Sequence, residues 1–190
     1  MTGRRERDGG IGINEDRAQS DLERYVDAGQ TTFDMADHYG SSEEIVGRSP
    51  VSTHMEALTK WCPTPTVRTQ TEHMAEAEEA VALAKSRLRA SSVFLLQYHC
   101  WDYLNPVYLD HLRHLDEMRR RGDLRMLGLC NFDTAHLRIV VESGIHIATN
   151  QVSYSLLDTR AAAMMAPYCL SKQIKLLCFG TLLGGFLTGV

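Results

Sequence analysis

The chain has 190 residues, of which 44% are hydrophobic and 23% are charged. These values are typical of a globular protein with a sizeable buried core, and they exclude disorder as its main state. Its 20 basic and 24 acidic residues give a formal net charge of -4. Nucleic acids and anionic membranes bind basic surfaces, so neither is expected as a partner.

The sequence shows no sign of a targeting signal, a membrane span or a metal site. The longest apolar run, residues 176–187, is too short for the roughly 18–20 residues that span a bilayer, and three glycines interrupt it. The first ten residues are basic but precede no apolar segment, unlike a secretory signal. The five cysteines are widely spaced and include no Cys-x-x-Cys pair, which favours reduced thiols over disulfides or structural zinc. We therefore expect a cytoplasmic protein that binds no metal.

The first half of the chain alternates between amphipathic runs and short apolar runs. Residues 1–15 carry no periodic apolar pattern and are expected to form a loose N-terminal segment. Helical spacing of apolar positions begins near Asp16 and ends at Gly29, while the apolar run at 93–99 is typical of a strand covered on both faces. The expected elements are a helix at 16–28, a strand at 31–36, a helix at 41–48, a strand at 56–61, a helix at 72–89 and a strand at 93–99.

The second half repeats this alternation. Pro106 stands where a helix can begin and Gly122 where it ends, and Asp133 and Gly144 bound the next helix in the same way. The expected elements are a helix at 106–121, a strand at 124–132, a helix at 133–143, a strand at 145–155 and a strand at 174–180. The segment at 160–172 is expected to be helical for at least its first half.

Six strands that alternate with helices indicate parallel βα units. Two folds fit: an open doubly wound sheet and a (β/α)8 barrel. The first unit lacks a Gly-x-Gly-x-x-Gly turn, which weighs against a dinucleotide-binding open sheet. Polar side chains instead stand at or just after the carboxyl ends of successive strands, where a barrel builds its active site. They are Asp34, Tyr39, Lys60, His99, Asn131 and Gln151.

Each of these residues has a structural alternative, such as a solvated lysine, a core histidine or a turn-capping aspartate. Together they suit proton transfer to a carbonyl oxygen. Lys60 beside Tyr39 is expected to lower the pKa of the phenol from its usual value near 10, and Asp34 to hold the lysine. A neutral His99 would hydrogen-bond the substrate oxygen. The group contains no electron source, so a nicotinamide cofactor is expected to supply the hydride.

Segments along most of the chain resemble the aldo-keto reductase family in letters, order and spacing. FDMADHYG at 33–40 and SSEEIVG at 41–47 are similar to the family segment in which an Asp and a Tyr precede a helix. The other similar segments are TK at 59–60, LLQYH at 95–99, GLCNF at 128–132, NQVSYSLLD at 150–158 and CFGTLLGGFLTG at 178–189. The resemblance covers nearly all of residues 16–189.

The resemblance implies a TIM-type (β/α)8 barrel that reduces a small-molecule aldehyde or ketone. It implies that NADP is the cofactor, with NAD as the alternative. The implied catalytic residues are Asp34, Tyr39, Lys60 and His99, with Tyr39 as proton donor. The residues implied to bind the cofactor are Asn131, Gln151, Phe179, Gly180 and Leu182. Two letters depart from the family pattern: Phe179 stands where a tyrosine is common, and Cys130 replaces a serine that donates more strongly.

The chain is shorter than this resemblance implies. Such barrels have eight βα units and about 250 residues, whereas six strands are counted here. We expect residues 16–190 to form a truncated, incomplete barrel without the first strand and the last units. Either this is a partial gene product or another chain completes the barrel. The open edges, at 31–36 and 174–180, are expected to allow self-association.

Two other functions fit the sequence less well. A non-catalytic binding or regulatory module would use the same fold, although the intact tetrad letters speak against it. A metal-dependent hydrolase would need a cluster such as His-x-His at a strand end, and the sequence contains none.

The sequence does not identify the substrate. Trp61, Trp101 and Tyr103 follow strand ends and are expected to line an apolar pocket or to cap the barrel rim.

Overall fold

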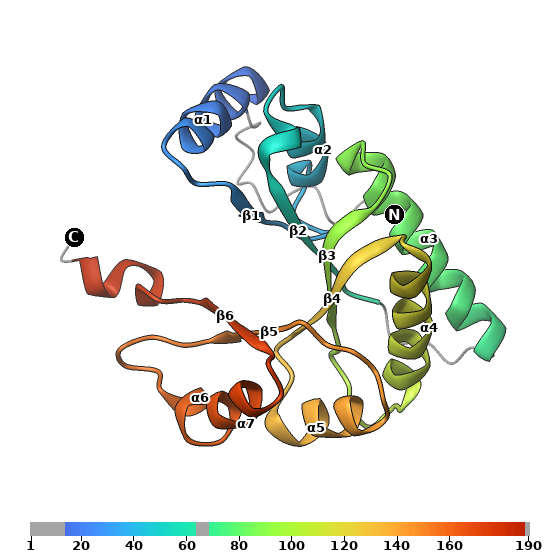
Figure 1. Cartoon of the computed structure of the whole chain (residues 1–190). Helices are drawn as coiled ribbons and strands as arrows, with labels where there is room; N and C mark the ends of the chain where they lie inside the picture. Colours follow the sequence, from blue (N-terminus) through green and yellow to red (C-terminus); the bar gives the residue numbers. More distant parts are fainter. Residues whose placement is uncertain (1–13, 64–68, 189–190) are drawn as a thin grey trace.

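A curled parallel sheet organises the molecule. The computed structural model describes residues 14–63 and 69–188, and the strands within them pair in chain order. They are β1 (Thr32–Asp34), β2 (Glu56–Trp61), β3 (Val93–His99), β4 (Leu124–Cys130), β5 (Thr149–Ser153) and β6 (Lys175–Phe179). Helices cover the outer side of the curl, and β1 and β6 are its two edges (Figure 1). The predicted incomplete (β/α)8 barrel with six strands is confirmed.

The helices begin and end where the sequence supplies capping groups. They are α1 (Glu15–Asp27), α2 (Ser42–Arg48), α3 (Gln70–Leu88), α4 (Val107–Arg121), α5 (Thr134–Glu142), α6 (Arg160–Ala163) and α7 (Met165–Ser171), with short 3-10 turns η2 (Ser52–His54) and η3 (Leu183–Thr188). Asn14 and Asp133 accept hydrogen bonds from the first turns of α1 and α5. Gly122 ends α4 in the left-handed conformation that glycine adopts at least cost.

The strand register decides which side chains face the interior of the curl. Lys60 on β2 lies beside Gln97 on β3. His99, Cys130 and Gln151 lie side by side on β3, β4 and β5. Because side chains alternate along a strand, these residues share one face while their neighbours in sequence point toward the helices. The predicted site therefore gathers on the interior face.

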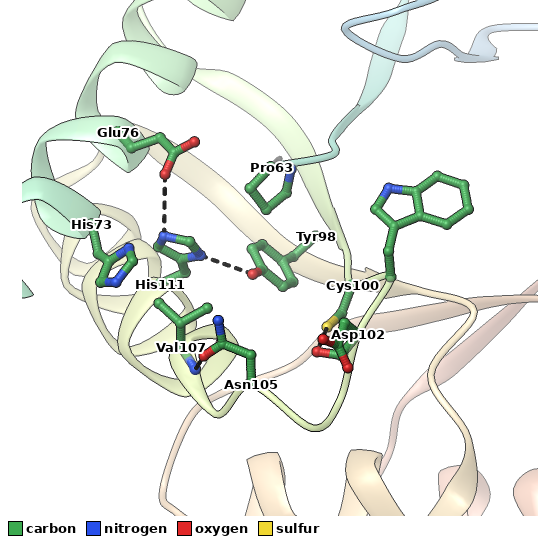
Figure 2. Close-up of a pocket in the computed structure, with 10 residues that line it drawn as sticks. Pro63, His73, Glu76, Tyr98, Cys100, Asp102, Asn105, Val107 and His111 are labelled. Atoms are coloured by element: carbon green, nitrogen blue, oxygen red, sulfur yellow. Dashed lines mark hydrogen bonds and ion pairs between the residues drawn. The ribbon is translucent and has the colours of Figure 1, made fainter. Parts of the chain in front are cut away.

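The apolar core fills the space between the sheet and the helices. Leu96 and Tyr98 on β3, and Leu112 and Leu115 on α4, are fully buried there. The Tyr98 hydroxyl lies 2.8 Å from Nδ1 of His111 on α4, so this core also contains a polar contact (Figure 2). Since both faces of β3 are covered, its sequence is apolar almost throughout, as the sequence analysis expected.

The segment at 160–172, predicted to be helical for at least its first half, forms two helices, α6 and α7, which divide at Met164. Pro167 explains the break. A proline has no amide hydrogen, and its ring clashes with the carbonyl four residues earlier, here that of Ala163. The regular helix therefore stops at that carbonyl and resumes in the next turn.

The predicted strand at 145–155 is too long, because β5 begins only at Thr149. Ile145 and Ile147 alternate with polar residues and are buried in the core, which explains the strand-like pattern. Alternation reports which side chains are buried, whereas a strand also requires ladder hydrogen bonds to a neighbour. These begin as the chain reaches β4, where the Ala148 amide donates to the Leu127 carbonyl at 2.8 Å.

Of the predicted N-terminal segment at 1–15, residues 1–13 lie outside the described part of the chain. The Pro-rich loop at 61–66 is described only as far as Pro63. Among residues 14–63 and 69–188, no helix combines the length and apolar character needed to cross a membrane.

Candidate active site

An ion pair between buried Lys60 and partly exposed Asp34 forms the centre of the interior cluster. Lys60 is 3% exposed, and its Nζ donates to Asp34 Oδ2 at 2.5 Å and to the Met35 carbonyl at 2.9 Å. Asp34 Oδ1 accepts a further hydrogen bond from Gln97 Nε2 at 2.8 Å. The carboxylate is thus held from β1, β2 and β3 at once, and it fixes the ammonium in the interior of the curl.

Tyr39 lies in the turn that follows β1 and is 50% exposed. Its backbone amide donates to the Ala36 carbonyl at 3.0 Å, and Lys60 Nζ lies 5.2 Å from the centre of its ring. Burial, and then the negative charge of Asp34, raise the pKa of the Tyr39 phenol above its usual value. The expectation that Lys60 lowers this pKa is therefore wrong. Asp34 pairs with Lys60 at 2.5 Å, which offsets the positive charge near the phenol.

His99 ends β3 on the same interior face and is buried. Its Nδ1 lies 3.6 Å from Cys62 Sγ, and its ring stacks on Trp101 with 4.1 Å between ring centres. Burial, and then the nearby His38 and Lys60, lower the pKa of the His99 imidazole. A neutral imidazole results near pH 7, as expected, and it offers one N–H donor.

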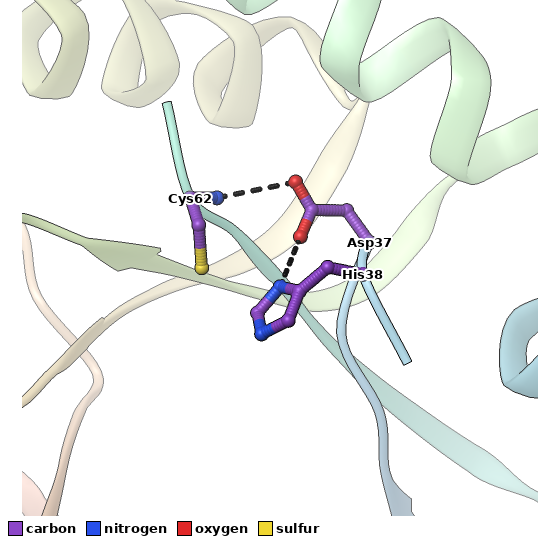
Figure 3. Close-up of side chains that lie close together, drawn as sticks. All are labelled: Asp37, His38 and Cys62. Atoms are coloured by element: carbon purple, nitrogen blue, oxygen red, sulfur yellow. Dashed lines mark hydrogen bonds and ion pairs between the residues drawn. The ribbon is translucent and has the colours of Figure 1, made fainter. Parts of the chain in front are cut away.

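Other residues that the sequence analysis did not single out hold the Tyr39 turn. Asp37 Oδ1 lies 2.7 Å from His38 Nδ1, and Asp37 Oδ2 accepts a hydrogen bond from the Cys62 amide at 3.3 Å (Figure 3). The His38 ring packs edge-on against Tyr39 with 4.9 Å between centres. From α3, Arg87 donates to the Asp37 carbonyl at 3.2 Å. The turn is thus joined both to the end of β2 and to the helix layer.

Gln97 is the clearest omission from the predicted site. It is fully buried and holds Asp34, yet only residues at strand ends were considered. A signal was available, because Gln97 lies two residues before His99 and therefore faces the same side of β3. A glutamine within a run of apolar residues, one step deeper than a candidate histidine, indicates a supporting contact.

The residues expected to bind a cofactor lie at the ends of β4, β5 and β6. Asn131 is exposed and adopts a positive φ of 61°, and its backbone amide donates to the Gln151 carbonyl at 2.8 Å. Gln151 Oε1 lies 3.7 Å from Cys130 Sγ, and burial raises the pKa of this thiol to about 11, so it stays a neutral donor. Phe179 ends β6 on the interior face and is partly exposed, with register partner Ser153 on β5.

The remaining two residues of this group follow β6. Gly180 has a positive φ of 66°, which turns the chain away from the strand, and Leu182 is exposed. The structure therefore places Asn131 and Gln151 together and sets Phe179 on the adjacent edge strand. It shows no contact of Leu182 with the others in the described residues.

The three aromatic residues that were expected to line a pocket or to cap the rim, Trp61, Trp101 and Tyr103, lie in different parts of the structure. Trp101 is exposed and stacks on His99, so it borders the interior cluster. Trp61 is buried on the helix side of β2, where its ring lies 4.8 Å from that of His111. Trp61 follows Lys60 directly and so points to the opposite face, where it lines a cavity beside α3. Tyr103 donates to the Asn131 carbonyl at 3.2 Å and supports that loop.

The fold and cluster together define the class of protein: a (β/α)8-type barrel with acid–base groups at the carboxyl ends of its strands. The family model of the aldo/keto reductase family matches residues 5–190, so the chain belongs to this family.

Individual relatives agree with this assignment. An NADH-specific methylglyoxal reductase from Escherichia coli is 27% identical over 114 residues, which are 58% of this chain and 34% of that protein. A glycerol dehydrogenase from Gluconobacter oxydans is 27% identical, with a TM-score of 0.79 over 94% of this chain and 57% of that one.

An aldo/keto reductase from Klebsiella pneumoniae, solved with NADP and acetate, superposes with a TM-score of 0.77 at 21% identity. The match covers 91% of this chain and 61% of that one and shows the shared fold. The chain thus spans less than two thirds of the length of each of these relatives.

Proposed function

We propose that this chain carries the acid–base site of a nicotinamide-dependent carbonyl reductase, which converts a small aldehyde or ketone to an alcohol. One observation carries the proposal: the pair between buried Lys60 and partly exposed Asp34 lies against the ring of Tyr39 on the interior face that also holds His99. A buried lysine held by a carboxylate beside a half-exposed phenol is an arrangement typical of a site for proton transfer, so its position favours a chemical role.

Tyr39 is the proposed proton donor. Its raised pKa keeps the phenol protonated at neutral pH, so a proton is available for the oxygen atom of the substrate. As the phenol gives up this proton, the ammonium of Lys60, 5.2 Å from the ring centre, stabilises the developing phenolate. Asp34 and Gln97 hold Lys60 in place and touch no reacting atom.

His99 is proposed to orient the substrate. A neutral imidazole donates one hydrogen bond to the carbonyl oxygen and leaves the proton transfer to Tyr39. Trp101, stacked on His99 and largely exposed, adds an apolar surface beside that oxygen. This arrangement favours small carbonyl compounds over charged polymers, and the E. coli relative, a methylglyoxal reductase, acts on such a compound.

Asn131 and Gln151 are proposed to hold the carboxamide of a nicotinamide, and Phe179 to stack on its ring, with Gly180 and Leu182 beside it. The donor set fits, because two side-chain amides offer both the acceptor and the donor that a carboxamide requires. When bound, the reduced nicotinamide supplies the hydride to the carbonyl carbon. NADP is the proposed cofactor, since the Klebsiella structure contains it, and NAD is the alternative because the E. coli relative is NADH-specific.

A non-catalytic binding module is the second candidate. It is favoured by the two open sheet edges, β1 and β6, within the described residues. Such a module would bind cofactor or a partner through the same surface without turnover.

One experiment separates the two candidates. The purified chain is titrated with NADPH and with NADH while protein fluorescence is followed, and reduced cofactor is then assayed for consumption with methylglyoxal and a panel of aldehydes and ketones. The reductase proposal predicts binding together with carbonyl-dependent consumption. Binding without consumption by any compound supports the module, and absence of both contradicts the two candidates.

A further inference from the structure

A second cluster of ionisable residues lies on the helix side of the sheet, away from the interior face that holds Lys60 and His99. His73 and Glu76 project from α3 and His111 from α4, around a small pocket that Tyr98 also lines (Figure 2). We propose that His73, Glu76 and His111 bind a divalent transition-metal ion, and that Zn²⁺ fits the site best.

The geometry allows all three side chains to reach one ion. One ligand atom from each residue lies within 4.8 Å of the others, and Glu76 Oε2 is 3.7 Å from His111 Nε2. Bonds of about 2.0–2.1 Å in a tetrahedral zinc site place ligand atoms about 3.4 Å apart. Since His73 and Glu76 are three residues apart, they share one face of α3. Small rotations of the side chains therefore close the site.

The burial of His73 favours the binding of a cation by its imidazole. It is 7% exposed, and its Nδ1 has no hydrogen-bond partner among the described residues. Removing an imidazole nitrogen from water without replacing its hydrogen bond is costly. A cation held by this nitrogen offsets that cost.

His111 is oriented by a partner on its other nitrogen. Its Nδ1 lies 2.8 Å from the Tyr98 hydroxyl, which is buried beside it in the core. With Nδ1–H donating to Tyr98 Oη, the lone pair of Nε2 is left on the side of Glu76. Metal-bound histidines usually donate their second N–H to such a partner, which fixes the tautomer and the ring.

The ligand set selects the metal. Two imidazoles and one carboxylate suit zinc and similar ions, whereas Mg²⁺ and Ca²⁺ prefer oxygen ligands throughout. The pocket that these three residues line has a volume of about 20 Å³, enough for one water molecule, which would supply a fourth ligand. The ion would join α3 to α4 in the outer layer.

The same two helices provide a matched control. His114 on α4 contacts Glu78 on α3 at 2.9 Å through Nε2, and Glu117 at 3.3 Å through Nδ1. Its two carboxylates lie on opposite sides of the imidazole and cannot converge on one ion. His114 is therefore equally well placed between the helices but lacks a metal-binding arrangement.

The test uses the whole 190-residue chain, treated with chelator and titrated with ZnCl₂ by calorimetry. We expect one Zn²⁺ per chain and a higher unfolding temperature with zinc, neither of which Mg²⁺ reproduces. His73→Gln and Glu76→Gln should each weaken zinc binding at least tenfold, and Tyr98→Phe about 10–100-fold through loss of the orienting contact. His114→Gln should bind zinc as the unmodified chain does.

A different cluster, Asp37, His38 and Cys62, also gathers three metal-ligating atoms within 4.8 Å and must be separated from this one. His38→Gln disables that cluster and should leave zinc binding unchanged. Circular dichroism checks that each variant is folded before titration. Failure of the chain to bind zinc, unchanged binding in both His73→Gln and Glu76→Gln, or loss of binding in His38→Gln would each overturn the proposal.

Discussion

Gln97 illustrates how one buried amide couples stability to chemistry. Its Nε2 holds Asp34, but its own Oε1 is buried without a hydrogen-bond partner among the described residues. A buried carbonyl oxygen left unpaired costs free energy, and a buried hydrogen bond to a carboxylate gains a similar amount. The residue therefore contributes little net stability while it positions the carboxylate that holds Lys60.

Replacing Gln97 with Met should separate these two effects. We expect the free energy of unfolding to change by less than about 1 kcal/mol, because the lost hydrogen bond and the removed unpaired oxygen offset each other. The turnover number should fall while the Michaelis constant for the carbonyl stays near its original value, since Asp34 and Lys60 lose their alignment. A turnover number equal to that of the unmodified chain would contradict the positioning role.

His99 should make stability depend on pH. Its pKa is lowered in the folded state from an ordinary value near 6.5, so the unfolded chain binds more protons just below that pH. Its contribution is complete above about pH 6.5 and is lost as the pH falls through that value toward the lower folded pKa. Urea unfolding measured between pH 8 and pH 5 should show this decline.

The matched comparison for this titration is between the unmodified chain and the His99→Gln variant. His99→Gln should flatten the decline in stability below pH 6.5. An equal slope in the unmodified chain and in His99→Gln would show that the histidine does not cause the decline.

The sequence predicted the positions of the site residues better than their electrostatics. Strand ends located Asp34, Lys60 and His99, because parallel strands bring their carboxyl ends to one rim. The pKa of Tyr39 was predicted in the wrong direction, since its sign depends on how completely Asp34 neutralises Lys60 and on burial. Both the pairing of Asp34 with Lys60 and the burial of Tyr39 depend on the folded structure, so they could not be predicted from the sequence.

The zinc ligands could not be found from spacing either. His73 and His111 are 38 positions apart (111 − 73), on two helices separated by a strand. Metal motifs are recognisable in a sequence when ligands lie within a few residues of one another. Here only the packing of α3 against α4 brings them together, so the expectation of a chain without a metal site is replaced by the proposal above.

At the level of whole elements, the close approach of α2 to α3 depends on one glycine. A Cβ at Gly47 would lie 2.2 Å from the Arg87 carbonyl oxygen and 2.7 Å from backbone atoms of Leu88. Backbone atoms cannot rotate away as a side chain can, so the helices must separate. From the same region Arg87 also donates to Glu43 at 2.9 Å and to the Asp37 carbonyl, which links this contact to the Tyr39 turn.

Gly47→Ala should therefore destabilise the chain by about 1–3 kcal/mol, despite the higher helix propensity of alanine. It should also lower turnover, because α3 loses its fixed position against the turn. Ser86→Ala, at an exposed position on α3, is the control and should be neutral or slightly stabilising. Thermal unfolding of both variants measures the difference, and equal midpoints would refute the close approach.

Elements bounded by local signals were predicted most accurately. The strands at 56–61 and 93–99 are observed at those same bounds. Turn residues on both sides of an apolar run fix where the strand begins and ends. The expected helix at 72–89 begins two residues earlier, where Thr69 and Glu72 form a reciprocal capping pair. The break at Met164, before Pro167, was not predicted.

At the level of the whole molecule, the open edges of the curl should control behaviour in solution. Within the described residues, β1 and β6 each have a strand on one side only. The segments before and after β6 carry large exposed apolar side chains, among them Leu156, Leu157, Leu170, Leu182 and Phe186, the last 78% exposed. Unpaired strand edges and apolar patches both favour association.

The isolated 190-residue chain is therefore expected to self-associate. Size-exclusion chromatography at several concentrations should show an oligomer that grows with concentration, and an apolar dye should fluoresce brightly with it. Lys substitutions at both Leu182 and Phe186 should reduce the apparent size, since they add charge to the exposed patch. A compact monomer at every concentration that gives no dye fluorescence and unfolds in one cooperative transition would contradict this expectation.

In the proposed reaction, Tyr39 is the group that gives its proton to the substrate oxygen. The most direct test compares carbonyl-dependent consumption of reduced cofactor by the unmodified chain and by Tyr39→Phe, with cofactor affinity measured in parallel by fluorescence. Tyr25→Phe, which removes an exposed hydroxyl from α1, serves as the control. We predict a 10²–10⁴-fold loss of turnover in Tyr39→Phe, about 3–5 kcal/mol of barrier, with cofactor affinity nearly unchanged. Retention of most of the rate in Tyr39→Phe would contradict the central claim.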